Sequence, residues 1–326
     1  MQSECLICKS NSLVKIMEKA DDRYGYPGNF SLFKCSRCDF IETFPRLSDL
    51  ESSDLYTNYY PRKNVSAEDV LQSVNKDHAF IRWLKGLHNT AHYHISKGTR
   101  VLDIGCGSGT SLLEIKNMDA EPYGTEVDEN IRPISKELGL NVEIGNIDNS
   151  NYPDNFFDII TISQVIEHIP DPVSFINKTK KKLKDNGEII LSFPNTNSVF
   201  RFIFREKWIN WHVPYHQNHF SRENIKILAE RTGLRIKRIR TITPTIWTFM
   251  QLRSFLSLFK GSCRERPPKD LRESENADSG NQFLRRDRAY LFNLVKLFFF
   301  LLISVLNRGI DLLGIGDSFL IILYRQ

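Results

Sequence analysis

The stretch Val101-Leu-Asp-Ile-Gly-Cys-Gly-Ser-Gly109 decides the fold of this 326-residue chain. Its first residues form an apolar run that favours a buried strand. Three glycines follow at every second position, and glycine lets a backbone turn sharply and approach a ligand closely. The spacing differs from the Gly-x-Gly-x-x-Gly pattern of dinucleotide-binding proteins. The stretch therefore predicts a strand, a tight ligand-binding turn and the start of a helix.

An alternation of strand and helix patterns surrounds this loop. We expect a helical region at 66–96, then strands at 101–104, 123–127, 142–144, 157–163, 188–193, 234–242 and 317–325, with helices at 109–118, 129–138, 173–183 and 223–231. Strands that alternate with helices are typical of a parallel sheet covered on both faces. The sequence therefore predicts an α/β fold.

A carboxylate follows the second predicted strand. Glu126 lies 21 residues after Gly105. At this position of a βαβ unit, a carboxylate can accept hydrogen bonds from ribose hydroxyls. Together with Asp103, it indicates a site for a cofactor that carries a nucleoside.

Composition and charge exclude several classes of protein. Hydrophobic residues make up 41% of the chain and charged residues 25%, which excludes collagen-like and wholly disordered chains. The net charge is +5, without a concentrated stripe of basic and aromatic residues, so we expect no nucleic-acid partner. The first residues, MQSECLICKS, lack a secretory signal, so we expect a cytoplasmic location.

Two pairs of cysteines mark the N-terminal region. Cys5 and Cys8 form one C-x-x-C pair, and Cys35 and Cys38 form another. Four thiolates suit a tetrahedral Zn²⁺ ion, and a region with so few apolar residues favours a metal staple. Four protein ligands would close the site, so the predicted zinc is structural. The alternative is two unrelated pairs of thiols.

The combined motifs resemble those of class I S-adenosylmethionine-dependent methyltransferases. The quoted loop resembles their first motif, Tyr123-Gly-Thr-Glu126 their second, and 152–172 their fourth-strand region. The cysteine-rich front is similar to the zinc-ribbon extension of bacterial members, several of which act in sugar or polysaccharide pathways.

The resemblance implies a doubly wound, seven-stranded Rossmann-like sheet with a small zinc ribbon and a helical insertion before the last strand. The expected organisation is a zinc-ribbon-like module at 1–60, a methyltransferase domain at 61–244 and 315–326, and an insertion at 245–314.

The resemblance also implies which residues bind S-adenosylmethionine. Asp103 and Gly105 would contact its methionine end, Glu126 its ribose, and Asn146 its adenine, where the family has an acidic residue. The full predicted set is Asp103, Gly105, Cys106, Gly107, Gly109, Glu126, Val127, Asn146, Ile147, Ser163 and Gln164.

Methylation of a hydroxyl needs a base to remove its proton. His168 and Glu167 follow the fourth strand, and His216 lies with His212 and His219 in a later segment, so we predict catalytic roles for Glu167, His168 and His216. Some similar O-methyltransferases hold Mg²⁺ with an E-x-x-E-H motif. Gln164 replaces the first carboxylate here, so Mg²⁺ is the less favoured alternative.

The C-terminal part contains the most apolar stretch. The charged segment 264–288 predicts a mobile linker, and an apolar helix is expected at 290–307. Its apolar core of about 16 residues is short for a membrane span. Two interpretations stay open. The helix packs over the rim of the active site, or it makes peripheral contact with the inner face of the membrane, with basic residues facing anionic headgroups.

The sequence thus predicts an S-adenosylmethionine-dependent methyltransferase. The expected acceptor is a small molecule or glycan that offers a sugar hydroxyl. The alternatives are a lipid-soluble, quinone-like acceptor, a sugar carbon atom, and a protein that binds the cofactor without turnover.

Overall fold

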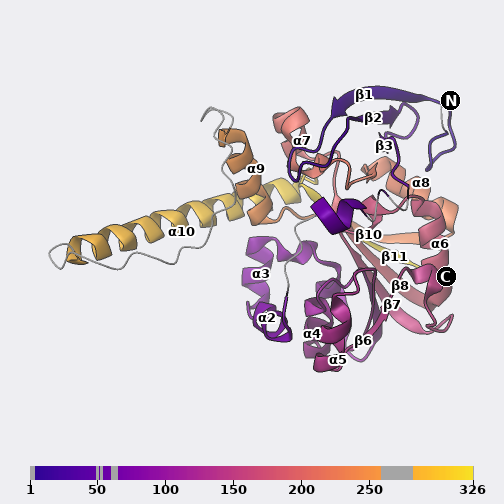
Figure 1. Ribbon diagram of the computed structural model, residues 1–326, viewed down its shortest axis with the longest axis horizontal. Coiled ribbons are helices and arrows are strands. Elements are labelled where there is room, and N and C mark those ends of the chain that lie inside the picture. The colour runs from indigo at the N-terminus through magenta and orange to yellow at the C-terminus, as the bar shows by residue number, and fades with distance from the viewer. Residues whose placement is uncertain (1–3, 49–50, 52–53, 60–64, 258–281, 326) are drawn as a thin grey trace.

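A seven-stranded sheet forms the centre of the molecule in a computed structural model that describes residues 4–48, 51, 54–59, 65–257 and 282–325 (Figure 1). The strand order is β10-β11-β8-β7-β4-β5-β6. Five strands are parallel: β4 (Arg100–Ile104), β5 (Glu121–Glu126), β6 (Asn141–Ile144), β7 (Phe157–Ser163) and β8 (Leu183–Pro194). Of the last two, β11 (Ser318–Tyr324) pairs antiparallel with β8, and β10 (Arg235–Thr241) pairs antiparallel with β11, so β11 alone among these seven described strands runs against the others. The predicted doubly wound α/β sheet is confirmed.

Apolar side chains cover both faces of this sheet because successive residues of a strand point to opposite sides. Ile159 and Ile190 belong to one buried cluster, whereas Ile160 and Ile189 belong to another. Four helices flank the sheet: α4 (Thr110–Asn117), α5 (Ile131–Leu138), α6 (Pro172–Lys182) and α8 (Arg222–Thr232).

The helical region predicted at 66–96 is broken into pieces. Ser66 caps α2 (Ala67–Ser73), and Gly86 ends α3 (Ala79–Lys85) in the left-handed conformation, with φ of 73°. A side chain at residue 86 would collide with the backbone of Thr243. Short helical turns follow at η2 (Leu87–Asn89) and η3 (Ala91–His94); the others are η1 (Leu55–Tyr59), η4 (Ile147–Asn149), η5 (Ile166–His168), η6 (Arg205–Lys207) and η7 (Ile209–Trp211).

A second, four-stranded sheet carries the cysteine pairs. It contains β1 (Leu13–Lys19), β2 (Phe30–Cys35) and β3 (Ile41–Phe44), which are antiparallel. Its fourth strand is β9 (Asn218–His219), where His219 pairs with Ile41. The N-terminal module therefore shares a sheet with a segment that lies between β8 and β10 in the chain.

Three helices lie at the far end of the sheet from α5: α7 (Val199–Phe204), α9 (Thr245–Ser257) and α10 (Gln282–Leu312). Figure 1 shows α10 extending well away from the body. The helix predicted at 290–307 lies inside it. Residues 264–281 of the predicted linker lie outside the described residues. Residues 282–288 belong to α10 rather than to a linker, because the helix begins eight residues before the apolar stretch. Within the described part of the chain, no helix is long and apolar enough to cross a membrane.

Candidate active site

The glycine loop lies at the carboxyl edge of the parallel strands, between β4 and α4. Gly105, Gly107 and Gly109 have φ of 75°, 56° and 89°, a region that favours glycine. A Cβ on Gly105 would come within 2.6 Å of Val165, whereas one on Gly107 would meet open space. The loop therefore packs against the end of β7 on one side and leaves room for a ligand at Gly107.

Two predicted carboxylates brace this loop. Glu126 accepts hydrogen bonds from the backbone N–H of Gly107 at 2.8 Å and of Asp128 at 3.0 Å. Asp103 is buried and accepts from the hydroxyls of Ser111 at 2.5 Å and Thr161 at 2.6 Å. Burial raises the pKa of Asp103. Asp103 thus links α4, the helix after the loop, to β7, while Glu126 holds the loop at the partly exposed end of β5.

The remaining predicted cofactor residues divide into buried and exposed groups. The side chains of Cys106 and Ile147 belong to the core, so only their backbones could meet a cofactor. Val127 is 62% exposed, and Asn146 is also exposed, at the ends of β5 and β6. The hydroxyl of Ser163 accepts from the N–H of Ala91, and Gln164 has a left-handed backbone with φ of 55°. All of these positions follow the carboxyl ends of β4, β5, β6 and β7, where open α/β sheets bind ligands.

The three predicted catalytic residues come together. Glu167 and His168 belong to η5, which begins beside Gly105, and His216 comes from the loop before β9. Their ligand atoms all lie within 4.8 Å of one another. Nδ1 of His168 lies 2.8 Å from the carbonyl of Tyr215, and Nδ1 of His216 lies 2.9 Å from that of Asn210. Because a carbonyl only accepts, each neutral ring carries its proton on Nδ1 and its lone pair on Nε2.

Burial controls the charges of this cluster. It lowers the pKa of His168 to about 4 and that of His216 well below its usual value. It raises the pKa of Glu167 to about 8, and neither carboxylate oxygen of Glu167 has a hydrogen-bond partner among the described residues. At neutral pH the cluster therefore offers neutral imidazoles beside a carboxyl group without a partner.

Glu167, His168 and His216 could also hold a metal ion. Both rings already donate Nδ1–H to carbonyls, as metal-bound histidines usually do. One carboxylate and two imidazoles suit a transition metal or zinc better than Mg²⁺, which prefers oxygen ligands. The predicted Mg²⁺ alternative therefore fits these residues poorly.

The neighbouring histidines are part of the packing. His212 stacks on Tyr215 with ring centroids 4.7 Å apart, and its edge meets Tyr24 of the N-terminal module. Nε2 of His219 lies 3.2 Å from the hydroxyl of Thr43. Burial lowers the pKa of His212 to about 2 and that of His219 to about 3.

The four cysteines of the N-terminal module form one cluster. Their sulfur atoms lie within 4.8 Å of one another, with Cys5 to Cys38 at 3.6 Å and Cys8 to Cys35 at 3.5 Å. Three of the four are buried. This arrangement fits a tetrahedral zinc ion.

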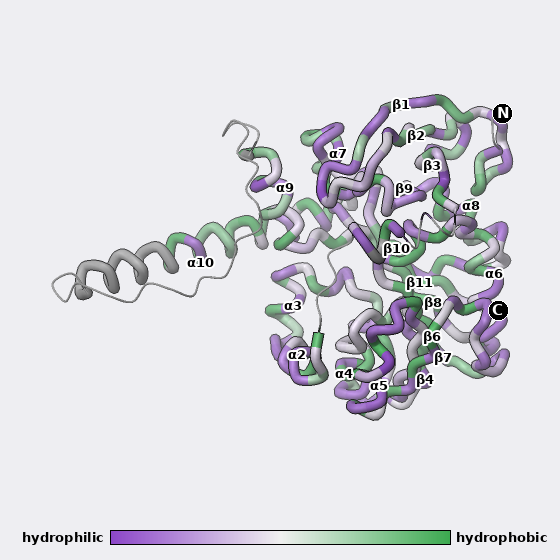
Figure 2. Tube along the Cα trace, in the orientation of Figure 1, coloured by the Kyte–Doolittle hydropathy of each residue, from purple (hydrophilic) through white to green (hydrophobic). Residues whose placement is uncertain are grey.

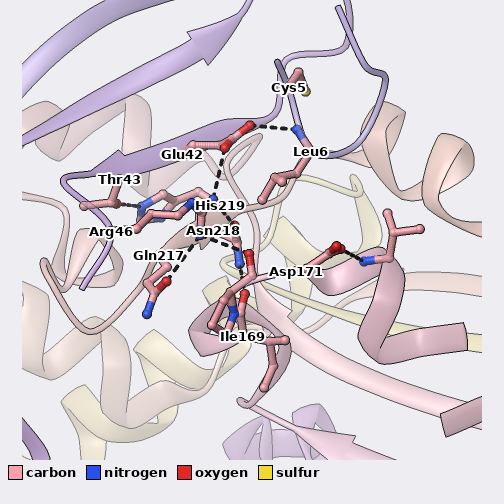
Figure 3. A network of polar contacts seen from close by, with 12 residues as sticks. Cys5, Leu6, Glu42, Thr43, Arg46, Ile169, Asp171, Gln217, Asn218 and His219 are labelled. Atoms are coloured by element: carbon pink, nitrogen blue, oxygen red, sulfur yellow. Dashed lines mark hydrogen bonds and ion pairs between the residues drawn. The ribbon is translucent and has the colours of Figure 1, made fainter. Parts of the chain in front are cut away.

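A network that the sequence did not reveal joins this cluster to the segment that follows His216 (Figure 3). Glu42, only 1% exposed, accepts from the N–H of Leu6 and from Arg46, each at 3.0 Å. Arg46 also donates to Gln217 at 3.2 Å and Asn218 at 3.1 Å. In the sequence, the one local sign of this network is that Arg46 lies eight residues after Cys38. Its partners are far away in the sequence.

Comparison with known proteins finds similarity to methyltransferases. Residues 75–238 match the family model described as "Methyltransferase domain". Ubiquinone biosynthesis O-methyltransferases from Erwinia tasmaniensis and Coxiella burnetii are 32% and 30% identical over 108 and 107 residues, 31% of this chain in each case. The chain spans 44% and 46% of their lengths. A crystal structure of a SAM-dependent methyltransferase from Archaeoglobus fulgidus is 20% identical, with a TM-score of 0.42, and the match covers 85% of this chain and all of that one.

Proposed function

Because the chain belongs to the family of methyltransferase domains, we propose that it transfers a methyl group from S-adenosylmethionine to a hydroxyl of an apolar, phenol-like acceptor. The observation that carries this proposal is the cluster of Glu167, His168 and His216, which begins two residues after Val165, the side chain that packs against Gly105. A cofactor held by that loop and by Glu126 would have its methyl-bearing end close to the cluster.

The chemistry is an in-line displacement. The acceptor oxygen attacks the methyl carbon, the carbon–sulfur bond breaks, and S-adenosylhomocysteine leaves as a neutral thioether. The acceptor proton passes to Nε2 of His168, whose Nδ1 proton is held by the Tyr215 carbonyl. The cofactor supplies the activated methyl group, so the protein contributes chiefly orientation and the base.

The weakness of this base favours a phenol over a sugar hydroxyl. An imidazole with a pKa of about 4 accepts a proton reluctantly. A phenol has a pKa of about 10 and an ordinary hydroxyl lies several units higher, so the phenol is much easier to deprotonate. The names of the E. tasmaniensis and C. burnetii relatives, ubiquinone biosynthesis O-methyltransferases, support the same class of acceptor.

Structural zinc is part of the proposal. Cys5, Cys8, Cys35 and Cys38 would hold it, and four protein ligands leave it no open position for chemistry. Its contribution is to fix the N-terminal module against the loop that carries His216.

The test follows the methyl label. The purified protein is incubated with methyl-labelled S-adenosylmethionine and an extract of its source, which is then separated into lipid-extractable and water-soluble pools. We expect label as an aryl methyl ether in the lipid pool, formed about 10²-fold to 10⁴-fold more slowly by His168→Gln. Label in sugar-containing material would overturn the acceptor and leave the activity standing. Binding of S-adenosylhomocysteine without any labelled product would overturn the activity itself.

A further inference from the structure

Helix α10 presents its apolar side chains outward. Large hydrophobic residues that are 42–62% exposed lie between positions 294 and 306: Leu294, Val295, Leu297, Phe298, Phe299, Leu301, Leu302, Val305 and Leu306. At about 100° per residue they cover an arc of about 200°. Figure 2 shows this hydrophobic stretch where the helix leaves the body. A contiguous apolar surface of this kind marks an interaction site.

Two polar side chains in the C-terminal half of the same helix point inward. Ser304 and Asn307 are at most 1% exposed. The hydroxyl of Ser304 lies 3.0 Å from that of Thr245 on α9, and Asn307 donates to Thr248 at 2.9 Å. Phe249 of α9 stacks on Phe300 with centroids 5.9 Å apart. A helix pair with hydrogen bonds between its members and apolar residues on its outside reverses the pattern of water-exposed helices, and is typical of helices in lipid.

The apolar surface continues beyond α10. Ile246 and Leu256 of α9 are 57% and 58% exposed, and Phe202 and Ile203 of α7 are each 63% exposed. The rings of Phe204 and Phe255 meet edge to face at 5.4 Å, which connects α7 to α9. Three helices therefore contribute to one apolar end of the molecule, which we call the α7–α9–α10 surface.

The width and length of this surface indicate its partner. A single partner helix would cover only a narrow strip of α10, whereas lipid can cover the whole arc of about 200°. The apolar core of α10, about 16 residues, is about 24 Å long, less than the roughly 30 Å of a bilayer interior. The helix is therefore long enough to enter one leaflet and too short to cross the whole bilayer interior.

Charge at the start of α10 agrees with a lipid partner. The sequence of its first two turns holds three arginines, at positions 285, 286 and 288, with one acidic residue. Basic residues next to an apolar helix bind anionic headgroups, each worth about 1 kcal/mol near the surface.

We propose that the α7–α9–α10 surface docks this protein on the surface of an anionic lipid bilayer, with the apolar side of α10 in one leaflet. This proposal does not depend on the acceptor or on methyl transfer. Of the two interpretations of the apolar helix, the side-chain orientations favour peripheral contact with a membrane over packing on the rim of the active site.

The experiment is vesicle flotation of the full chain. Vesicles of phosphatidylcholine with one quarter phosphatidylglycerol are compared with vesicles of phosphatidylcholine alone. The test variant, Phe298→Glu/Val305→Glu, places two charges near the centre of the outward arc, at residues that are 62% and 60% exposed. The matched control is Val14→Glu, on the N-terminal module, where the valine is 57% exposed.

We expect the wild type and the control to float with anionic vesicles, and the test variant to partition at least tenfold less. S-adenosylhomocysteine binding and circular dichroism establish that all three proteins are folded. A wild-type protein that stays out of the vesicle fraction at low salt would overturn the proposal. So would a dimer, seen by sedimentation, that the test variant dissociates, because a second copy would then cover the surface.

Discussion

Arg46 donates to the side-chain oxygen of Asn218 across 3.1 Å, and this bond joins the cysteine-bearing module to the strand that follows His216. The same guanidinium pairs with buried Glu42. One residue further back, the N–H of Gln217 donates to the carbonyl of Glu167. The position of the cluster of Glu167, His168 and His216 thus depends on the N-terminal module through a short series of hydrogen bonds.

Replacing Arg46 should therefore destabilise the protein. Arg46→Ala leaves the 1%-exposed carboxylate of Glu42 without its cation, and loss of one member of a buried pair costs about 3–5 kcal/mol. We expect a thermal unfolding midpoint lower by several degrees. The control is Lys15→Ala, whose ion pair with Glu18 is about half exposed and should matter by less than about 1 kcal/mol. Equal shifts for the two variants would contradict the role of Arg46.

One zinc ion per chain should be measurable by elemental analysis. Cys35→Ser removes one of four ligands, so we expect most of the zinc to be lost and the unfolding midpoint to fall. Cys106→Ser is the matched control, because Cys106 is also buried but lies outside the cluster. Wild-type protein that folds with no metal would refute this prediction.

Glu126 should matter for cofactor affinity. A hydrogen bond to a charged group contributes about 1.5–3 kcal/mol, so Glu126→Gln should raise the Kd of S-adenosylhomocysteine by about 10-fold to 100-fold in calorimetry. Glu121→Gln, at the opposite end of β5, should leave the Kd within twofold. Similar affinities for the two variants would show that Glu126 does not contact the cofactor.

The pH profile of methyl transfer should identify the base. Burial holds the pKa of His168 at about 4, so the ring is neutral above about pH 5, and kcat/KM should fall only below that pH. His168→Gln should reduce kcat by about 10²-fold to 10⁴-fold. Exposed His78 serves as the control, and His78→Gln should keep the wild-type profile. An acidic limb centred near pH 6.5 would instead indicate a solvent-exposed histidine as the base.

The free energy of unfolding should decrease as the pH rises, because of Asp317. This buried carboxyl accepts from Trp208 and Asn210, and burial raises its pKa to about 6. The folded state therefore binds a proton more tightly than the unfolded state, so this contribution is complete below about pH 4 and is lost as pH rises through 6. Between pH 5 and 7, the wild type should lose about 1 kcal/mol more than Asp317→Asn in denaturant titrations. Parallel curves would exclude this contribution, since the buried histidines act equally in both proteins.

The parts of the fold that depend on local signals were predictable. The left-handed conformations at Gly105, Gly107 and Gly109 follow from glycine itself, and the succession of strands and helices along the chain follows from the alternation of patterns. The break of the helical region at Gly86 was missed because it depends on the nearby backbone of Thr243. The partners of Arg46 were also beyond sequence reasoning, because Asn218 lies 172 residues away. His216 approaches His168 through contacts between segments about 50 residues apart, such as the hydrogen bond from Gln217 N–H to the Glu167 carbonyl.

Ile41 pairs with His219, so the N-terminal sheet is completed by a strand that the ribosome makes long after β3. At about 5–20 residues per second, the ribosome needs roughly 10–40 s to reach β9 after it has made β3. All four cysteines are made before that interval begins. Metal capture by the nascent chain can therefore precede folding of the larger sheet, and the metal-loaded module would then be the template to which β9 adds.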